Sequence, residues 1–208
     1  DWYNAENFAV SVTASDADGI ASVTYTTDEA EPQTGSVTLS GGTGSITGLH
    51  EGNYNLTVTA TDNSGNTTQQ TLAIKLDCTL PVIEDWWNDP MPQSNYMQVT
   101  VEATDENSGI AEIHYQTNDM DSYGVATPNG VTNEYVFGLY EAYQGTIALW
   151  AVDNAGNVTF LQGSEITVDT TPPAIDVVYS QEPNEFGWNN EDITLTVTVK
   201  DEGISQGL

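Results

Sequence analysis

Acidic and amide side chains gather in short clusters along this sequence, and they carry its clearest chemical signal. The turn Asp-Asn-x-Gly-Asn occurs at residues 62–66 and again at residues 153–157, and the acidic run 105–107 precedes the second of these turns. Carboxylate and amide oxygens are the ligands that calcium prefers, and it takes about six to eight of them. We therefore predict that calcium is the cofactor of these clusters.

The predicted calcium ligands fall into three groups. The central group contains Asp77, Asp105, Glu106, Asn107, Asp153, Asn154 and Asn157. An earlier group contains Asp16, Asp18, Asp62, Asn63 and Asn66, and a later one begins with Asp169, Asp201 and Glu202. None of the loops has the spacing of an EF-hand.

The same residues have a purely structural interpretation. Asp and Asn side chains hydrogen-bond the local backbone and tolerate left-handed conformations, so they form tight turns without any metal. Both interpretations stay open from the sequence.

Tryptophan offers a second kind of chemistry, because its ring can stack on a sugar. Trp86 and Trp87 are consecutive, so on a strand one of them points away from the core, and Trp150 has the outward register between two apolar neighbours. Trp87 and Trp150 are therefore candidate carbohydrate ligands. The alternative is that these rings pad neighbouring loops. The pair Trp2 and Tyr3 repeats the earlier pattern and favours padding.

The sequence offers no convincing set of catalytic residues, and we expect that the protein is not an enzyme. His50 and His114 have no counterparts elsewhere in the chain, and the single cysteine, Cys78, allows no internal disulfide. The carboxylate pairs recur with the rest of the pattern, which favours a structural role over an acid pair for glycoside hydrolysis. A Lys–Asn isopeptide bond is also disfavoured, because Lys75 and Lys200 are the only lysines.

The charge of the chain limits its partners. Against 31 Asp and Glu there are only 2 Lys and Arg, for a net charge of −29. Residues 1–80 carry −9, residues 81–172 carry −14 and residues 173–208 carry −6. Such a chain repels nucleic acid and anionic membranes and attracts divalent cations. No apolar run is long enough to span a bilayer, so no direct membrane insertion is expected.

Internal repeats show which elements must position these side chains. The segment GIASVTYTTD beginning at Gly19 returns as GIAEIHYQTND at Gly109, and IKLDCTLPVI at Ile74 returns as ITVDTTPPAI at Ile166. We predict a first repeat at residues 1–80 with a truncated N-terminal edge, a second at 81–172, and a partial third at 173–208 that holds its first two strands. The neighbouring repeats are each other's expected partners.

Each repeat has the alternation of a β-strand that buries one face. Apolar residues occupy every second position from Met97 to Ala103, with matching series at residues 8–14 and 193–199. Short strands separated by Gly, Asn and Asp turns predict an all-β fold of tandem immunoglobulin-like antiparallel β-sandwich modules. The expected strands of the second repeat are 83–87, 97–104, 110–117, 124–127, 135–139, 146–152 and 158–168.

This topology brings the acidic clusters together. In such a sandwich the loop after the second strand and the loop after the sixth emerge at the end where the preceding linker enters. For the second repeat these are the loops of Asp105 and Asp153, and the linker contributes Asp77. Unpaired carboxylates in one place repel each other unless a cation lies between them.

Three segments give the chain a family resemblance: GWNNEDITLTVTVKDEGI from Gly187, the turn at residues 153–157, and the linker DTTPPAI from Asp169. They resemble the bacterial immunoglobulin-like repeats of large surface and adhesin proteins. The resemblance implies an extracellular or cell-surface stalk, and calcium at some junctions. The first linker departs from the pattern with Leu80 in place of Pro172, which predicts a slightly less constrained hinge.

The function expected from these observations is a non-catalytic spacer stiffened by calcium at the module junctions. The alternatives are a carbohydrate-binding module that uses an outward tryptophan, or an accessory domain of a secreted glycoside hydrolase. The sequence does not identify a host or carbohydrate ligand.

Overall fold

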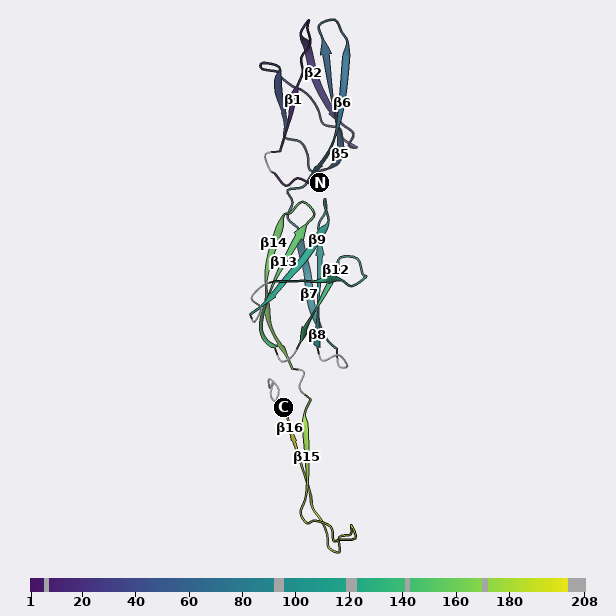
Figure 1. The fold of residues 1–208 in the computed structure, drawn as a ribbon, viewed down its shortest axis with the longest axis vertical. Coiled ribbons are helices and arrows are strands. Elements are labelled where there is room, and N and C mark those ends of the chain that lie inside the picture. The colour runs from purple at the N-terminus through teal and green to yellow at the C-terminus, as the bar shows by residue number, and fades with distance from the viewer. Residues whose placement is uncertain (6–7, 92–95, 119–122, 141–142, 170–171, 202–208) are drawn as a thin grey trace.

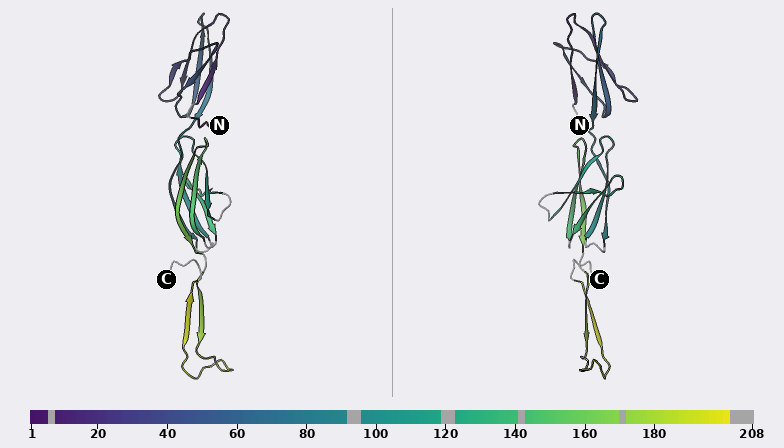
Figure 2. Two further views of the ribbon diagram at one scale, coloured as in Figure 1. Left: turned by 90° about the vertical axis from the view of Figure 1, so that its left-hand side faces the viewer. Right: turned by 45° about the vertical axis from the view of Figure 1, so that its right-hand side comes forward.

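The computed structural model describes residues 1–5, 8–91, 96–118, 123–140, 143–169 and 172–201. Three β-units follow one another along a single long axis (Figure 1), and two further views show the same linear arrangement (Figure 2). All the regular elements of these residues are β-strands. None of the described residues belongs to a helix that could cross a membrane.

The second module is a complete two-sheet sandwich. Its strands are β7 (Val82–Met91), β8 (Tyr96–Thr104), β9 (Ile110–Thr117), β10 (Gly124–Val125), β11 (Thr127–Pro128), β12 (Glu134–Tyr140), β13 (Tyr143–Asp153) and β14 (Val158–Val168). One sheet has the order β11-β12-β8-β7 and the other β10-β9-β13-β14, and the strands pair antiparallel throughout. This arrangement confirms the predicted immunoglobulin-like sandwich.

The first module repeats this plan with fewer strands. They are β1 (Ala9–Thr13), β2 (Ile20–Thr27), β3 (Thr34–Ser36), β4 (Thr43–Thr47), β5 (Gly52–Asp62) and β6 (Thr67–Leu76). The order β3-β2-β5-β6 matches the second sheet of the next module, and β1 pairs with β4. The third unit is an antiparallel pair, β15 (Ala174–Tyr179) and β16 (Leu195–Lys200).

The predicted alternation places the cores correctly in the two sandwiches. Val99, Val101 and Ala103 of β8 are fully buried, and they belong to the same core as Leu149 and Ala151 of β13. A separate core fills the first module around Val23, Ile46, Leu56 and Ile74. In the third unit the alternating apolar residues Leu195, Val197 and Val199 are exposed, because no second sheet covers the strand pair in the described residues.

Two expectations about individual strands were wrong. The expected fourth strand, 124–127, is two short strands on different sheets, because the chain crosses between the sheets at the buried Ala126. The pair Trp2 and Tyr3 is not equivalent to Trp86 and Trp87. Tyr3 forms a parallel bridge with Leu76, whereas the later pair lies in β7, antiparallel to β8.

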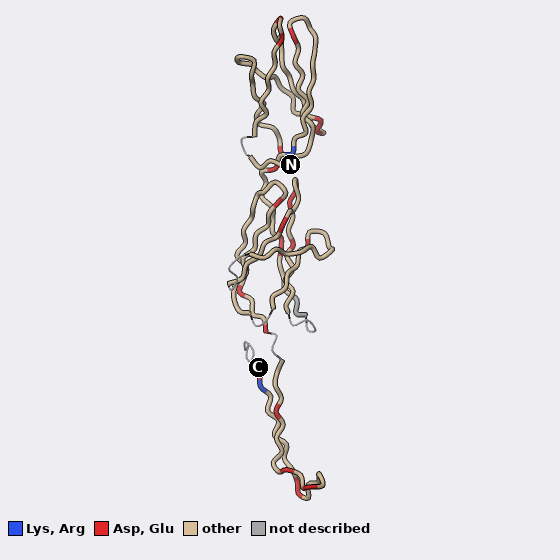
Figure 3. Tube along the Cα trace, in the orientation of Figure 1, with Lys and Arg blue, Asp and Glu red and all other residues tan. Residues whose placement is uncertain are grey.

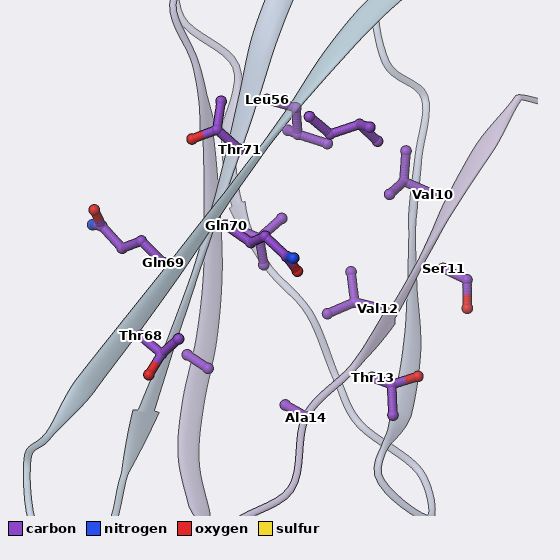
Figure 4. A pocket seen from close by; sticks show the side chains of 13 residues that line it. Val10, Ser11, Val12, Thr13, Ala14, Leu56, Thr68, Gln69, Gln70 and Thr71 are labelled. Atoms are coloured by element: carbon purple, nitrogen blue, oxygen red, sulfur yellow. The ribbon is translucent and has the colours of Figure 1, made fainter.

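A groove of about 510 Å³ lies between β1 and β6 of the first module (Figure 4). Its apolar lining includes Val10, Val12, Leu56 and Val58. In the second module the strand β7 lies at the corresponding sheet edge beside β8, and its Trp86 packs on the core. The groove of the first module therefore lies where the second module has β7.

Tyr54 stabilises the turn at His50 that precedes β5. Its ring is 6% exposed, and its hydroxyl donates a hydrogen bond of 2.8 Å to the carbonyl oxygen of His50. This is the tyrosine corner of immunoglobulin-like domains, in which a tyrosine near the start of the sixth strand bonds the backbone a few residues upstream. Burial, and secondly the negative charge of Glu29, raise the pKa of Tyr54 to about 12.

We predict that Tyr54→Phe lowers the free energy of unfolding of the first module by about 1–2 kcal/mol, because the carbonyl of His50 loses its donor. An unfolded tyrosine loses its proton near pH 10, so the contribution of Tyr54 is complete below that pH and is lost as the pH rises towards 12. Chemical denaturation between pH 7 and 11 measures both effects. Tyr3→Phe, at an exposed ring, is the control. Equal destabilisation by the two variants would contradict the assignment.

Candidate metal centre at the first module junction

Three carboxylates meet where the first module joins the second. Asp77 directly follows β6, Asp105 directly follows β8, and Asp153 is the last residue of β13. One oxygen from each side chain lies within 4.8 Å of the others. Asp77 is 0% exposed and Asp153 is 2% exposed, while Asp105 is half-buried. The structure thus brings together the linker and the two loops as the topology requires.

The turn after β13 holds Asp153 in place. Its Oδ1 accepts hydrogen bonds from the backbone N–H groups of Ala155 and Asn157, both at 2.8 Å. Its Oδ2 accepts one from Nδ2 of Asn157 at 2.7 Å. The Asp-Asn-x-Gly-Asn sequence therefore forms a rigid turn that fixes the carboxylate before any ligand binds.

Asp105 is held by only one of its two oxygens. Its Oδ1 accepts hydrogen bonds from the backbone N–H groups of Ser108 at 2.9 Å and Gly109 at 2.7 Å. Its Oδ2 is buried and has no hydrogen-bond partner among the described residues. A buried carboxylate oxygen without a donor is costly, and a bound cation would satisfy it.

Asp77 joins the two modules. Its Oδ2 accepts a hydrogen bond of 3.0 Å from the backbone N–H of Ser108, and its carbonyl oxygen accepts one of 3.0 Å from Nδ2 of Asn157. Nearby, Nδ2 of Asn107 reaches Oε2 of Glu51 in the first module at 3.2 Å. These hydrogen bonds restrain the first linker. The sequence had predicted this linker to be the less constrained of the two.

The cluster has a strong negative potential. The two ion pairs among the described residues each join a histidine to a glutamate, so neither compensates the three aspartates. Acidic residues are spread over the whole trace, while lysine appears at only two points (Figure 3). Three carboxylates this close repel one another, and a divalent cation between them would relieve that repulsion.

The other members of the central group have supporting positions. Asn154 donates from Nδ2 to the carbonyl oxygens of Ser108 and Gly109, so it links the two acidic loops. Glu106 is exposed. Glu51 was missed by the sequence reasoning. It also accepts a hydrogen bond of 2.7 Å from Oγ1 of Thr79. Its position in the turn before β5, at the end of the module where the linker leaves, could have indicated a role at the junction.

The matching group of the first module shows turn chemistry instead. Asp62 repeats the contacts of Asp153 with Ser64 and Asn66, and the side-chain hydrogen bond from Asn66 is the main cause that lowers the pKa of Asp62. Oδ1 of Asp16 accepts the backbone N–H of Asp18, whose own carbonyl accepts Nδ2 of Asn63. Among the described residues these side chains form no triad like that of Asp77.

The later group is exposed where it is described. Asp169 and Asp201 both lie at the surface, and Glu202 lies outside the described residues. Among the described residues, the central group is the one in which three carboxylates meet.

The remaining sequence candidates lie elsewhere. The two candidate sugar ligands, Trp87 and Trp150, lie on strands of different sheets, β7 and β13. His114 lies 2.7 Å from Oε2 of Glu112 on the outer face of its sheet. Cys78 packs against the first core, and neither lysine is fully buried.

Residues 4–78 match the family model described as a bacterial Ig-like domain, so the first module is identified as a domain of this kind. No curated protein matches the chain.

The chain is similar to several solved structures. Fibronectin(III)-like modules of CbhA from Clostridium thermocellum are 17% identical, with 80% of this chain and 87% of theirs covered and a TM-score of 0.37. A tetra-tandem repeat from the extending region of a large adhesion protein is 16% identical, with 95% and 60% covered and a TM-score of 0.41. Dimeric latent PorU from Porphyromonas gingivalis is 12% identical, with 95% and 24% covered and a TM-score of 0.35.

We predict that Asn157→Ala broadens the distribution of orientations between the first two modules, because it removes the bond to the carbonyl of Asp77. Asn66→Ala is the matched control, since Asn66 makes the same 2.7 Å bond within its turn. That turn joins β5 to β6 at the end of the first module away from the junction (Figure 1). Residual dipolar couplings of the two modules measure the orientation. An equal change in both variants would show that the bond to Asp77 does not hold the junction.

Proposed function

We propose that this chain, whose first module is a bacterial Ig-like domain, is a non-catalytic spacer of a bacterial surface or secreted protein, and that calcium stiffens its first junction. The observation that carries the proposal is the triad of Asp77, Asp105 and Asp153. It is largely buried, it has no compensating lysine or arginine, and it contains a buried carboxylate oxygen without a partner.

The donor set suits calcium well. All three side chains supply carboxylate oxygens, which hard cations prefer, and waters or backbone carbonyls can complete a flexible coordination shell. Magnesium demands near-ideal octahedral geometry and gives up its waters reluctantly, so it suits such a site less well. The backbone N–H groups that hold Asp105 and Asp153 fix two of the ligands in advance. Preorganisation of this kind lowers the entropic cost of binding.

A cation here would add a further link between the first module and the second. Asp77 continues from the last strand of the first module, while the other two aspartates belong to loops of the second. Binding all three therefore restrains the hinge, in addition to the hydrogen bonds from Asn157 and Ser108. A linear array with a restrained hinge holds whatever it carries at a fixed distance, which is what a spacer requires.

The same features support a location at the bacterial cell surface. The domain family is bacterial and immunoglobulin-like, and the net charge of −29 keeps the modules soluble and apart from anionic membranes. A site with few protein ligands binds calcium in the weak extracellular range, about 0.1–1 mM. Calcium would then occupy the junction outside the cell.

We predict that calcium raises the unfolding temperature of the first two modules. At about ten times its dissociation constant a ligand stabilises by roughly 1.4 kcal/mol, which for a domain of this size corresponds to roughly 5–10 °C. The measurement is thermal unfolding in calcium against a chelator, at ionic strength matched with a monovalent salt. Magnesium at the same concentration is the control. The same melting curve in calcium and chelator would exclude a calcium centre.

We predict that Asp105→Asn raises the melting temperature in chelator but not in calcium. In chelator the variant melts at a higher temperature than the natural chain, because it removes one of three like charges while its remaining oxygen still accepts from Ser108 and Gly109. In calcium this advantage disappears, because a ligand is lost. Asp16→Asn is the matched control at the turn of the first module. A calcium response preserved in Asp105→Asn would remove this residue from the site.

A further inference from the structure

The outer face of one sheet of the second module carries a continuous row of apolar and aromatic side chains. Val125, His114, Trp150 and Phe160 are paired in register across β10, β9, β13 and β14. Their chain neighbours Ile113 and Leu149 are fully buried, so alternation places the row on the opposite, solvent-facing side. The row extends over about 14 Å, since adjacent strands are about 4.8 Å apart.

The rings of this row make two ring contacts, one within the row and one with Tyr123 beside it. The ring centroids of Trp150 and Phe160 are 5.2 Å apart, and His114 stacks on Tyr123 at 4.3 Å with an interplanar angle of 12°. Phe160 is 54% exposed and Tyr123 is 58% exposed. Exposed rings held by neighbouring rings form a rigid platform that loses little entropy when a ligand binds.

The first module shows that the fold does not need this platform. The row in the same place consists of Ser36, Thr24, Thr59 and Gln69, which pair across β3, β2, β5 and β6. All four side chains are polar, yet the module has the same four-stranded sheet. The aromatic row is therefore an addition to the shared plan, and folding alone does not account for it.

A shallow hollow lies beside the row on the same sheet. It has a volume of about 250 Å³, and Ala148 lines it between Gln116 and Gln162, its cross-strand partners. Asn118 and Thr146 complete its neutral polar lining. The platform and the hollow together offer flat apolar rings next to amide and hydroxyl groups, a combination that suits a ligand with apolar faces and many hydroxyl groups.

The charge of the module decides among the ligands that could use such a surface. Residues 81–172 carry a net charge of −14 with no lysine or arginine, so nucleic acid, anionic membranes and acidic polysaccharides are repelled. A second copy of the chain carries the same negative charge and is disfavoured for the same reason. A neutral sugar chain meets no such barrier.

We propose that the Trp150–Phe160 row and the adjoining hollow bind a neutral oligosaccharide. The apolar faces of its rings stack on the aromatic side chains, and its hydroxyl groups bond to the amides of the hollow and to Glu112, which lies beside His114. This role differs from that of the spacer, because it depends on the outer face of one module and not on the junction. Of the two tryptophans that the sequence offers as sugar ligands, this site uses Trp150.

The test is isothermal titration calorimetry of the whole chain with four neutral hexasaccharides: cellohexaose, xylohexaose, mannohexaose and chitohexaose. We expect at least one to bind with a dissociation constant of about 1 mM or lower, with little dependence on salt. The variant Trp150→Thr with Phe160→Gln carries the residues that the first module has at these positions, so the fold accommodates it. It should weaken binding by about tenfold or more.

The matched control is Thr59→Ala with Gln69→Ala on the first module, which should leave the affinity unchanged. Thermal unfolding of both variants verifies that they fold. Failure of all four sugars to bind at about 1 mM, or equal binding by the Trp150 and Phe160 variant, would overturn the proposal. Concentration-dependent association of the chain that the same variant abolishes would assign the face to contact between copies and also overturn it.

Discussion

The alternation of buried and exposed residues along antiparallel strands is the constraint on which this molecule depends. Because Val99, Val101 and Ala103 point inwards from β8, and Leu149 and Ala151 do so from β13, the two sheets have one way to pack. That packing then decides where each loop emerges. The loop after β8 and the turn after β13 reach the same end of the module, where the linker enters, and so three aspartates from distant parts of the chain meet.

The second constraint is the lack of positive charge. The chain has 2 lysine and arginine residues in 208, and among the described residues neither ion pair joins a junction carboxylate to one of them. Backbone N–H groups and asparagine amides take that place. They donate to Asp77, Asp105 and Asp153, which explains why asparagine and glycine accompany the acids in each turn. Such neutral donors orient the carboxylates but leave the net negative charge of the cluster intact, and a cation is what would compensate it.

Sequence reasoning anticipated most of the fold and part of the site. Strict alternation and internal repeats predicted the strands of the second module to within a few residues, because one-sided burial leaves a strong pattern. The division of residues 124–128 between two sheets left no such pattern, since strands of two residues are too short to show one. The predicted equivalence of Trp2 with Trp86 was wrong, because the two similar sequence segments pair with different strands. Glu51 was missed because its contact crosses between modules.

The features that the two sandwiches share are those that the fold requires, and the features in which they differ are those that the fold permits. Both keep the inner apolar positions and the Asp-Asn-x-Gly-Asn turn, with the same hydrogen bonds at nearly the same lengths. The two modules differ at positions that the fold does not constrain. The outer sheet of the second module carries rings where the first module has threonine. Since a core residue must satisfy packing on all sides, new chemistry arises most easily at module ends and outer faces, and the two candidate sites of this chain lie in those places.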